Sequence, residues 1–312
     1  LLNAPVTTSI AGKSSFDETH PLALGSGGHA TTKMVYDFLY DADLIFGIGC
    51  SFAISSFATQ MPKNKRYIHA TLDPVDLNKD IQSELGMAGD AKLTLQSLIA
   101  ELKKLDLKKS AARKVSTPVA IKKVRDEWMD TWLPKLTSDQ NPMTPYRVIY
   151  EMNKLIDKSK VVITHDAGSP RDQLIPFWES THPLTYIGWG KTTQLGYGLP
   201  LAMGAKLARP DHLCINVWGD AAIGFTGMDF ETCVRERIPI MSILFNNFSM
   251  AMEIPIMKVS HAKYNTTNIS GDYSAMAKAF GGYSERITEP SEIVAALKRG
   301  IAATERGEAV LL

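Results

Sequence analysis

Three continuous apolar runs in the C-terminal half of the chain constrain its fold most. They are VVITHDAG from Val161, LCINVWGDA from Leu213 and IMSILFNN from Ile240, and each ends in polar or small residues. Parallel strands that are buried on both faces have this pattern. Segments with helical spacing precede the runs, at residues 146–157, 196–208 and 227–237. The sequence therefore predicts strands and helices that alternate around a parallel sheet, which is an α/β fold.

The N-terminal part repeats this layering with shorter runs. DLIFGIG (43–49) and RYIHATLD (66–73) are apolar segments bounded by polar or turn residues, with helical spacing around them. This favours a second domain with a parallel sheet. GIGCSF lacks the full glycine spacing of a dinucleotide-binding turn, so a tight turn is the favoured interpretation. Asp73 either contacts the ribose of a nucleotide or ends its strand beside Pro74.

The region between these two parts is rich in lysine and has a different character. It contains Pro118, Pro134 and the stretch AIKKVRDEWMDTWL, which has helical spacing and mixed charge on its outer face. Acidic residues interrupt the basic ones, which argues against a nucleic-acid interface. We expect a central domain at 1–105, a linker with a surface helix at 106–140, and a second domain at 141–312.

Composition excludes several functional classes. The 312 residues carry a net charge of +1, so there is no global field for nucleic acid. No apolar stretch is long enough to span a bilayer, and the N-terminus lacks the pattern of a secretory signal. The three cysteines are widely spaced, as expected of reduced thiols in a cytoplasmic protein. Both ends stop abruptly in apolar sequence, which predicts that they are cuts within a longer polypeptide.

Metal-binding side chains follow the predicted strands. Ligands of parallel sheets bind at the carboxyl ends of the strands, where Asp166, Asp220 and Asn247 are expected. A carboxylate and an amide oxygen are hard ligands that suit Mg²⁺. Backbone N–H groups near Ala221 and Ala222 are placed to meet a phosphate. The alternative is that Asp220 only caps a helix and that Asn246 and Asn247 are turn residues.

Three ordered motifs carry a resemblance to a known family. GDA at 219–221, followed by NN at 246–247, resembles the thiamine diphosphate motif, whose usual form is GDG to NN. QLGYGLPLAMGAKLA (194–208) is similar to the preceding segment in the acetolactate synthase, pyruvate oxidase and oxalyl-CoA decarboxylase group. AGKSSFDETHPLALG (11–25) resembles the entry to the central domain of that group. The resemblance covers almost the whole chain and implies a Rossmann-like central domain followed by a thiamine diphosphate-binding domain, each with three layers around a parallel sheet.

The resemblance implies roles for individual residues. The Asp220 and Asn247 side chains and the Ser249 carbonyl would bind Mg²⁺, and Leu195 would wedge between the cofactor rings and bend the cofactor. Thr193 and Gly196 would lie along the aminopyrimidine, and Met252 would face the substrate. The other residues implied in cofactor binding are Asp166, Gly168, Ser169, Gly219, Ala221, Ala222, Met250 and Ala251.

The implied function is that of an enzyme that makes or breaks a carbon–carbon bond next to a carbonyl, with thiamine diphosphate and Mg²⁺. Acetolactate synthase-like ligation of 2-oxo acids is the first choice. A 2-hydroxyacyl-CoA lyase or oxalyl-CoA decarboxylase is the close alternative. A non-catalytic nucleotide-binding or regulatory module is the alternative of another class. The implied assembly is a homodimer or homotetramer.

The sequence also departs from the family pattern. Ala221 replaces a glycine, and GCSFA stands where flavin-containing synthases carry an arginine, so FAD or ADP in the central domain is open. A pocket tryptophan of acetolactate synthases is replaced near Ile256. The glutamate that activates the cofactor belongs to an N-terminal pyrimidine-binding domain, and no residue of this chain matches it.

Three further side chains have alternative interpretations. His165 is either an acid–base group or a structural histidine at a strand end. Arg171 binds a substrate carboxylate or pairs at the surface with Asp172 or Glu179. Met250 and Met252 face the reacting centre or fill the core.

Overall fold

The structure is a computed structural model, in which residues 1–190 and 193–312 are described. These residues form two compact units. The first consists mainly of Leu1–Gly12 and Glu18–Thr131. The second contains Lys13–Asp17, Trp132–Trp189 and Thr193–Leu312. Each unit has parallel strand pairs with helices between them, which confirms the α/β class with parallel sheets.

The first unit contains two small parallel sheets. Strands β1 (Val6–Ser9) and β2 (Ala23–Gly27) form one sheet. The other has the order β3 (Leu44–Ile48), β4 (Arg66–Thr71) and β5 (Leu85–Ala88), and its first two strands are those predicted from sequence. The helical elements of this unit are α1 (Lys33–Asp41), η1 (Pro74–Asp76) and α2 (Ala91–Leu102).

A long helix, α3 (Lys108–Leu136), occupies the segment expected to be a linker. It continues through Pro118 and Pro134 as one element. Its Ile121 is 1% exposed and packs with Met34 and Val35 of α1 in the core of the first unit. The Arg125 guanidinium also donates a hydrogen bond to the Ala23 carbonyl at 2.6 Å. This part of the helix is therefore an integral element of the first unit.

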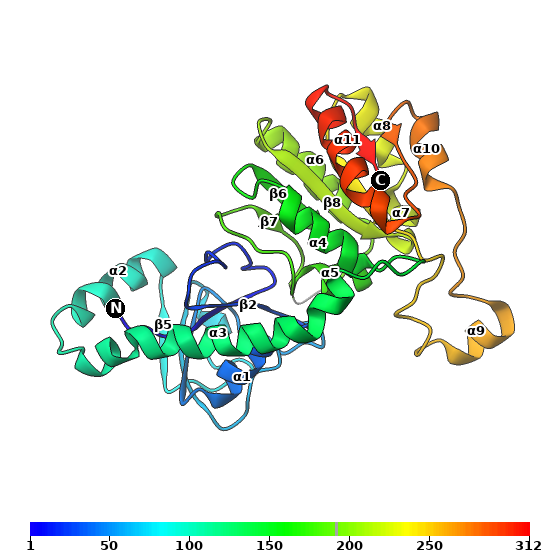
Figure 1. The fold of residues 1–312 in the computed structure, drawn as a ribbon. Coiled ribbons are helices and arrows are strands. Elements are labelled where there is room, and N and C mark those ends of the chain that lie inside the picture. The colour runs from blue at the N-terminus through cyan, green and yellow to red at the C-terminus, as the bar shows by residue number, and fades with distance from the viewer. Residues whose placement is uncertain (191–192) are drawn as a thin grey trace. The chain divides into compact units, whose positions relative to one another are not determined.

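The second unit is built on a six-stranded parallel sheet (Figure 1). The strand order is β10 (Tyr283–Ser284), β11 (Val310–Leu311), β9 (Met241–Phe245), β8 (Leu213–Gly219), β6 (Val161–His165) and β7 (Tyr186–Ile187). The helices are α4 (Pro145–Leu155), α5 (Ser169–Leu174), α6 (Gly198–Ala208), α7 (Asp220–Thr226), α8 (Asp229–Arg235), α9 (Lys258–Tyr264), α10 (Tyr273–Ala279), η2 (Pro290–Glu292) and α11 (Ile293–Glu305).

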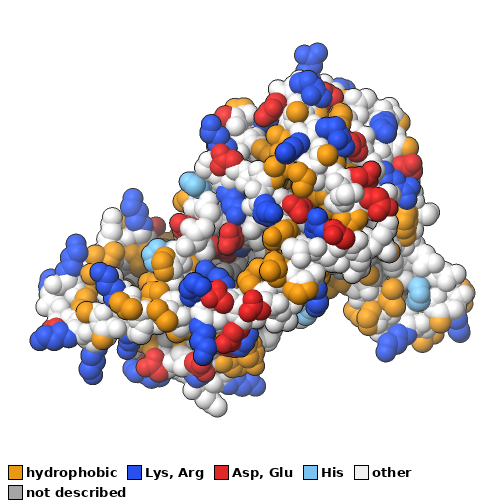
Figure 2. All heavy atoms as spheres, viewed as in Figure 1, with side chains coloured by type: hydrophobic (Ala, Val, Ile, Leu, Met, Phe, Trp, Pro, Cys, Tyr) orange, Lys and Arg blue, Asp and Glu red, His pale blue; other side chains and the backbone are white. Residues whose placement is uncertain are grey.

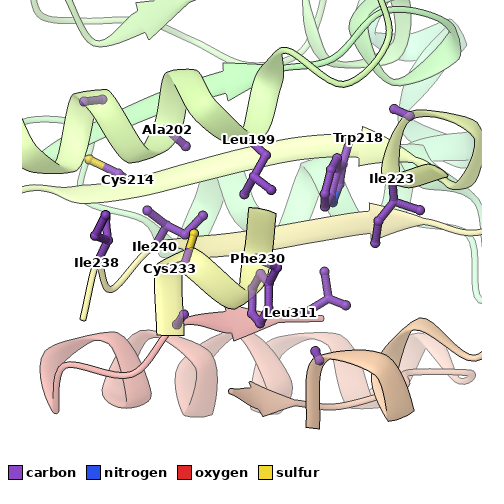
Figure 3. Close-up of a cluster of buried hydrophobic side chains, with 14 of the residues drawn as sticks. Leu199, Ala202, Cys214, Trp218, Ile223, Phe230, Cys233, Ile238, Ile240 and Leu311 are labelled. Carbon is purple, nitrogen blue, oxygen red and sulfur yellow. The ribbon is translucent and has the colours of Figure 1, made fainter. Parts of the chain in front are cut away.

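Side chains from the central strands and the helices beside them form the core of this second unit (Figure 3). Leu199 of α6 lies near Trp218 of β8, and Phe230 of α8 lies near Leu311 of β11. All four are 2% exposed or less. The burial of β6, β8 and β9 follows from their continuous apolar sequence. This rigid centre places the residues that follow these strands.

Cys214 and Cys233 belong to the same core and Cys50 to the first unit, and all three are free thiols. Burial raises the pKa of Cys214 to about 11 and that of Cys233 to about 12. On the face shown in Figure 2, basic and acidic side chains are interspersed. Within the described residues, no helix combines the length and apolar character needed to cross a bilayer.

Candidate functional site

The three strands predicted to carry the site are neighbours in the sheet. β6 pairs with β8 so that His165 lies opposite Val217, and β8 pairs with β9 so that Gly219 lies opposite Phe245. Because all three strands are parallel, the residues that follow them emerge at one edge of the sheet. Asp166, Asp220 and Asn246 each come directly after one of these strands.

One backbone N–H joins the two predicted metal-binding side chains. The Ser249 N–H donates to Asp220 Oδ2 and to Asn247 Oδ1, each at 3.1 Å. Phe248, with φ of 59°, reverses the chain between Asn247 and Ser249. A carboxylate oxygen and an amide oxygen, 27 positions apart in sequence, therefore converge on one point.

Burial and backbone hydrogen bonds act in opposite directions on the charge of Asp220. The side chain is only 3% exposed, and burial raises its pKa above the usual value. Hydrogen bonds from backbone N–H groups oppose this rise by stabilising the charged form; the largest such effect comes from Ser249 and the next from Ala221. A bound cation would add a further stabilising interaction with this charge.

A cavity of about 420 Å³ opens at this edge of the sheet, and its lining includes most of the residues predicted from sequence. The predicted residues that line it are Gly168, Ser169, Leu195, Gly219, Asp220, Ala221, Ala222, Asn247, Ser249, Met250, Ala251 and Met252. Asp166, Thr193 and Gly196 were predicted with them but do not line the cavity.

Asp166 is instead directed at the backbone of its own chain. It is 0% exposed, and its carboxylate accepts hydrogen bonds from the N–H groups of Ala167 at 2.9 Å, Gly196 at 2.9 Å and Gly198 at 3.0 Å. These donors oppose the rise in the pKa of Asp166 that burial causes. The geometry gives Asp166 a positioning role, because it fixes the turn that carries Leu195.

The turn after Leu195 is also fixed by steric packing. Gly196 has φ of 91°, and its carbonyl accepts a hydrogen bond from the Thr226 hydroxyl at 2.7 Å. A Cβ at Gly196 would lie 2.8 Å from Phe225 Cβ and 2.9 Å from Thr226 Cγ2. The turn therefore requires glycine for its backbone conformation and for space. Leu195 is half-buried beside it and lines the cavity.

The structure explains the departure at Ala221. This residue lies in the first turn of α7 and is not among the residues with positive φ. Helical φ is compatible with a side chain, so the usual glycine is not required here.

The two other candidate side chains, His165 and Arg171, do not line the cavity. His165 is 0% exposed, its Nδ1 lies 3.0 Å from the Asp166 carbonyl, and burial lowers its pKa to about 4. Arg171 is 1% exposed and holds Asp172 through two contacts, at 2.8 and 3.2 Å. Neither residue lines the cavity, which favours the structural interpretation of His165. The ion pair of Arg171 with Asp172 is buried, and does not lie at the surface as expected.

The donor atoms at the sheet edge fit Mg²⁺. The Asp220 carboxylate, the Asn247 amide oxygen and the Ser249 carbonyl are hard oxygen ligands. Ser249 Oγ is a buried polar atom that has no hydrogen-bond partner in the described part of the chain. The same part holds no cluster of three His, Cys, Asp or Glu side chains suited to a metal. A cation would therefore depend on these three protein oxygens and on oxygens of the bound cofactor.

Several residues that line the cavity were not predicted from the sequence. Glu253, Asp272 and Tyr273 belong to this group, as do Pro170 and Arg286. Glu253 lies six positions after Asn247, so proximity to NN was an available signal. Tyr273 and Arg286 come from elements far along the chain, and only the fold brings them to the cavity.

Comparison with protein families gives two matches in the expected order. Residues 1–98 match the central domain of thiamine pyrophosphate enzymes. Residues 166–312 match the C-terminal thiamine pyrophosphate-binding domain of the same enzymes. Thiamine pyrophosphate is another name for thiamine diphosphate.

Individual relatives cover nearly the whole chain. A probable acetolactate synthase large subunit of Methanococcus aeolicus is 29% identical over 96% of the chain and 52% of its own length. Acetolactate synthase isozyme 3 large subunit of Escherichia coli is 25% identical over 96% of the chain and 52% of its own length. A sulfoacetaldehyde acetyltransferase of Castellaniella defragrans is 25% identical over 96% of the chain and 54% of its own length. The chain thus spans about half the length of these relatives.

Proposed function

Because the chain belongs to the thiamine pyrophosphate enzymes, we propose that it binds the diphosphate end of this cofactor through Mg²⁺ at Asp220, Asn247 and the Ser249 carbonyl. The observation that carries this proposal is the Ser249 N–H shared by the two side-chain oxygens, each at 3.1 Å. Two metal-type oxygens at one point beside a cavity suit a cation that bridges protein and diphosphate.

Other residues in and beside the cavity have binding and orienting roles in this proposal. Leu195 supports the bend of the cofactor, and Asp166 holds the turn that positions Leu195. Gly168 and Ser169 contact the diphosphate. When bound, thiamine diphosphate supplies a carbon nucleophile and accepts negative charge from the acyl group; the protein supplies binding, orientation and electrostatics.

The proposed reaction makes or breaks a carbon–carbon bond next to a carbonyl, with a 2-oxo acid as donor. Acetolactate synthase-like ligation is the first choice, supported by the acetolactate synthases among the relatives. A lyase that acts on 2-hydroxyacyl-CoA or oxalyl-CoA is the alternative. The pocket tryptophan of acetolactate synthases is replaced near Ile256, and Ile256 does not line the cavity.

The assembly and the location are also proposals. By family resemblance, a pyrimidine-binding domain supplies the activating glutamate, and a second copy of the protein completes each site as a homodimer or homotetramer. We also propose a cytoplasmic location and domain boundaries at 1–105, 106–140 and 141–312, in which the 106–140 segment packs on the first unit through Ile121 of α3.

The residues after β3 do not fit a flavin held as in the flavin-containing synthases. Ser51 stands in the segment where those enzymes carry an arginine. The Phe52 ring packs against Tyr67 and His69 at centroid distances of 5.5 and 4.8 Å, and the Cys50 carbonyl lies 2.7 Å from His69 Nε2. No step of the proposed reaction involves a flavin.

Titration calorimetry of the full-length protein with thiamine diphosphate tests the cofactor site. We expect binding that requires Mg²⁺ and that Asp220→Ala weakens by about 100-fold, because a buried charge-assisted ligand is lost. Asp211→Ala is the matched control, since Asp211 is exposed and does not line the cavity. Magnesium-independent binding, or unchanged binding in Asp220→Ala, would refute the cofactor site.

The same preparation separates the alternative functions. A panel of 2-oxo acids and acyl-CoA donors is assayed for release of carbon dioxide. The products formed from each donor then distinguish ligation from lyase chemistry. Binding of ADP without binding of magnesium–thiamine diphosphate would favour the non-catalytic nucleotide-binding module.

A further inference from the structure

The metal-binding turn that follows β9 is held by a segment that lies between α9 and α10. The chain leaves the sheet after β9, forms α9 and returns to α10 (Figure 1). On its return, Asn268 forms an antiparallel bridge with Ser249. Beside this bridge, the Met250 N–H donates a hydrogen bond to the Thr267 carbonyl at 2.8 Å. The backbone that carries the proposed metal ligands is thus tied to the segment before α10.

The hydrogen bond between Met250 and Thr267 sets the direction of the Ser249 carbonyl. The Met250 N–H and the Ser249 carbonyl belong to the same peptide group, which is trans. In a planar trans peptide the N–H and the C=O point in opposite directions. Because the N–H is held on the Thr267 carbonyl, the Ser249 oxygen is turned away from Thr267.

The Ser249 carbonyl keeps the capacity to bind a cation. It accepts one hydrogen bond, from the Ala251 N–H at 2.9 Å. A backbone carbonyl oxygen has two lone pairs, so one lone pair is left for a metal ion. The hydrogen bond that the Met250 N–H donates polarises the same peptide group and makes its oxygen a stronger acceptor.

Thr267 is itself anchored, although it lies outside the cavity lining. Its side chain is 0% exposed, and Thr267 Oγ1 lies 2.6 Å from His261 Nδ1 on α9. The next residue, Asn268, donates its N–H to the Asn265 carbonyl at 3.0 Å, where α9 ends. The hydroxyl contact with α9 therefore fixes the residue whose carbonyl holds the Met250 N–H.

We propose that Thr267 is a positioning residue for the third protein ligand of Mg²⁺. Its hydroxyl is anchored on His261, and its carbonyl orients the Ser249–Met250 peptide so that the Ser249 oxygen faces the cation. This inference rests on the proposed function. It predicts an effect on the choice of metal ion, because Mg²⁺ demands near-ideal octahedral geometry, whereas Ca²⁺ accepts variable geometry and longer distances.

Metal titrations test this role without turnover. Mg²⁺ and Ca²⁺ are titrated separately into the full-length protein with excess thiamine diphosphate. Thr267→Val, which removes only the hydroxyl, should weaken Mg²⁺ binding by about 10-fold, as is typical when a group that orients a metal ligand is lost. Ca²⁺ binding should weaken by less than about threefold, so the preference for Mg²⁺ falls. Thr267→Ser keeps the hydroxyl and should restore the wild-type preference.

The adjacent threonine supplies the matched control. Thr266 is exposed, and its hydroxyl donates to Ser260 Oγ at 3.1 Å instead of contacting His261. Thr266→Val makes the same chemical change one position earlier and should bind both ions as the wild type does. The same loss in Thr266→Val as in Thr267→Val would refute the specific role of Thr267.

His261→Phe tests the contact from its other side. It keeps an aromatic ring, removes the nitrogen that contacts Thr267, and leaves the buried Thr267 in place, so it carries the test even if Thr267→Val does not fold. It should lower the preference for Mg²⁺ in the same direction. If both side chains act through one contact, the double variant should lose no more preference than either single variant. Additive losses would contradict this route.

The variant Asp220→Ala separates failure of this role from failure of the proposed function. If the wild type binds thiamine diphosphate without Mg²⁺, or Asp220→Ala binds it as the wild type does, both proposals are refuted. If Asp220→Ala is impaired but Thr267→Val and His261→Phe keep the wild-type preference for Mg²⁺, the role of Thr267 is refuted and the cofactor site stands. Equal weakening of Mg²⁺ and Ca²⁺ binding in these two variants would also refute it, because a general loss of structure does not discriminate between the ions.

Discussion

Gly196 is the residue whose backbone most constrains the site. Its φ of 91° and the 2.8 Å approach of Phe225 Cβ leave no room for a side chain. We expect Gly196→Ala to lower the free energy of unfolding by about 1–3 kcal/mol, because a left-handed backbone and a close contact are both strained. The variant should also weaken cofactor binding, since the turn carries Leu195. Urea unfolding and calorimetry measure the two effects.

Gly204 provides the control for this substitution. It lies within α6, and a Cβ added there would meet no atom within 4 Å. Gly204→Ala should be neutral or raise stability by about 0.5–1 kcal/mol, because alanine favours the helix. Equal effects of the two substitutions would contradict the role assigned to the Gly196 turn.

His165 gives the stability of the fold a pH dependence with a definite sign. Burial lowers its pKa to about 4 from the ordinary value of 6.5. Between these values the unfolded chain binds a proton that the folded chain does not, so the free energy of unfolding falls as pH decreases through 6.5 and goes on falling until about 4. The His165 contribution approaches about 1.4 kcal/mol per pH unit.

Substitution of His165 tests this dependence. Urea unfolding at about pH 7 and about pH 5 should show a smaller loss of stability in His165→Gln than in the wild type. The exposed His182 supplies the control, and His182→Gln should lose as much stability as the wild type. An unchanged pH dependence in His165→Gln would show that this histidine is not held neutral in the fold.

At the scale of elements, one face of α3 packs on the core of the first unit. Ile121 is 1% exposed, whereas Val119, two positions earlier, is 62% exposed. Ile121→Ala should lower the free energy of unfolding by about 2–5 kcal/mol through the cavity it leaves, and Val119→Ala should change it by less than about 0.5 kcal/mol. Urea unfolding of both variants measures this contrast, and a large effect at Val119 would contradict the observed packing.

The elements also show how far sequence determines the site. Continuous apolar runs predict β6, β8 and β9 correctly, because burial on both faces is a local property of the pattern. They also place Asp220 and Asn247 at one edge, since parallel strands end together. The function of Asp166 was not accessible in this way. Its partners Gly196 and Gly198 lie about 30 positions away, and only the fold reveals that its carboxylate accepts hydrogen bonds from their backbone N–H groups.

At the scale of the whole molecule, the cysteines report on the two units separately. Cys50 is half-buried in the first unit, while Cys214 and Cys233 are 0% exposed in the second. A thiol reagent should therefore label Cys50 slowly in the native protein and reach the other two only through unfolding of the second unit. Cys50→Ser should remove the native reaction. Comparable labelling rates for all three thiols would contradict this difference in burial.

Cofactor binding should change these labelling rates unequally. A ligand that binds only the folded state stabilises it by about 2.7 kcal/mol at 100 times its dissociation constant. When unfolding and refolding of the second unit are fast relative to the thiol reaction, the labelling rate follows the population of the unfolded form. Magnesium–thiamine diphosphate at that concentration should then slow the reaction of Cys214 and Cys233 by about 100-fold. The Cys50 rate should stay unchanged, because the proposed ligands all belong to the second unit. Equal slowing of all three thiols would instead mean that the two units open together, and no slowing at all would count against the cofactor site.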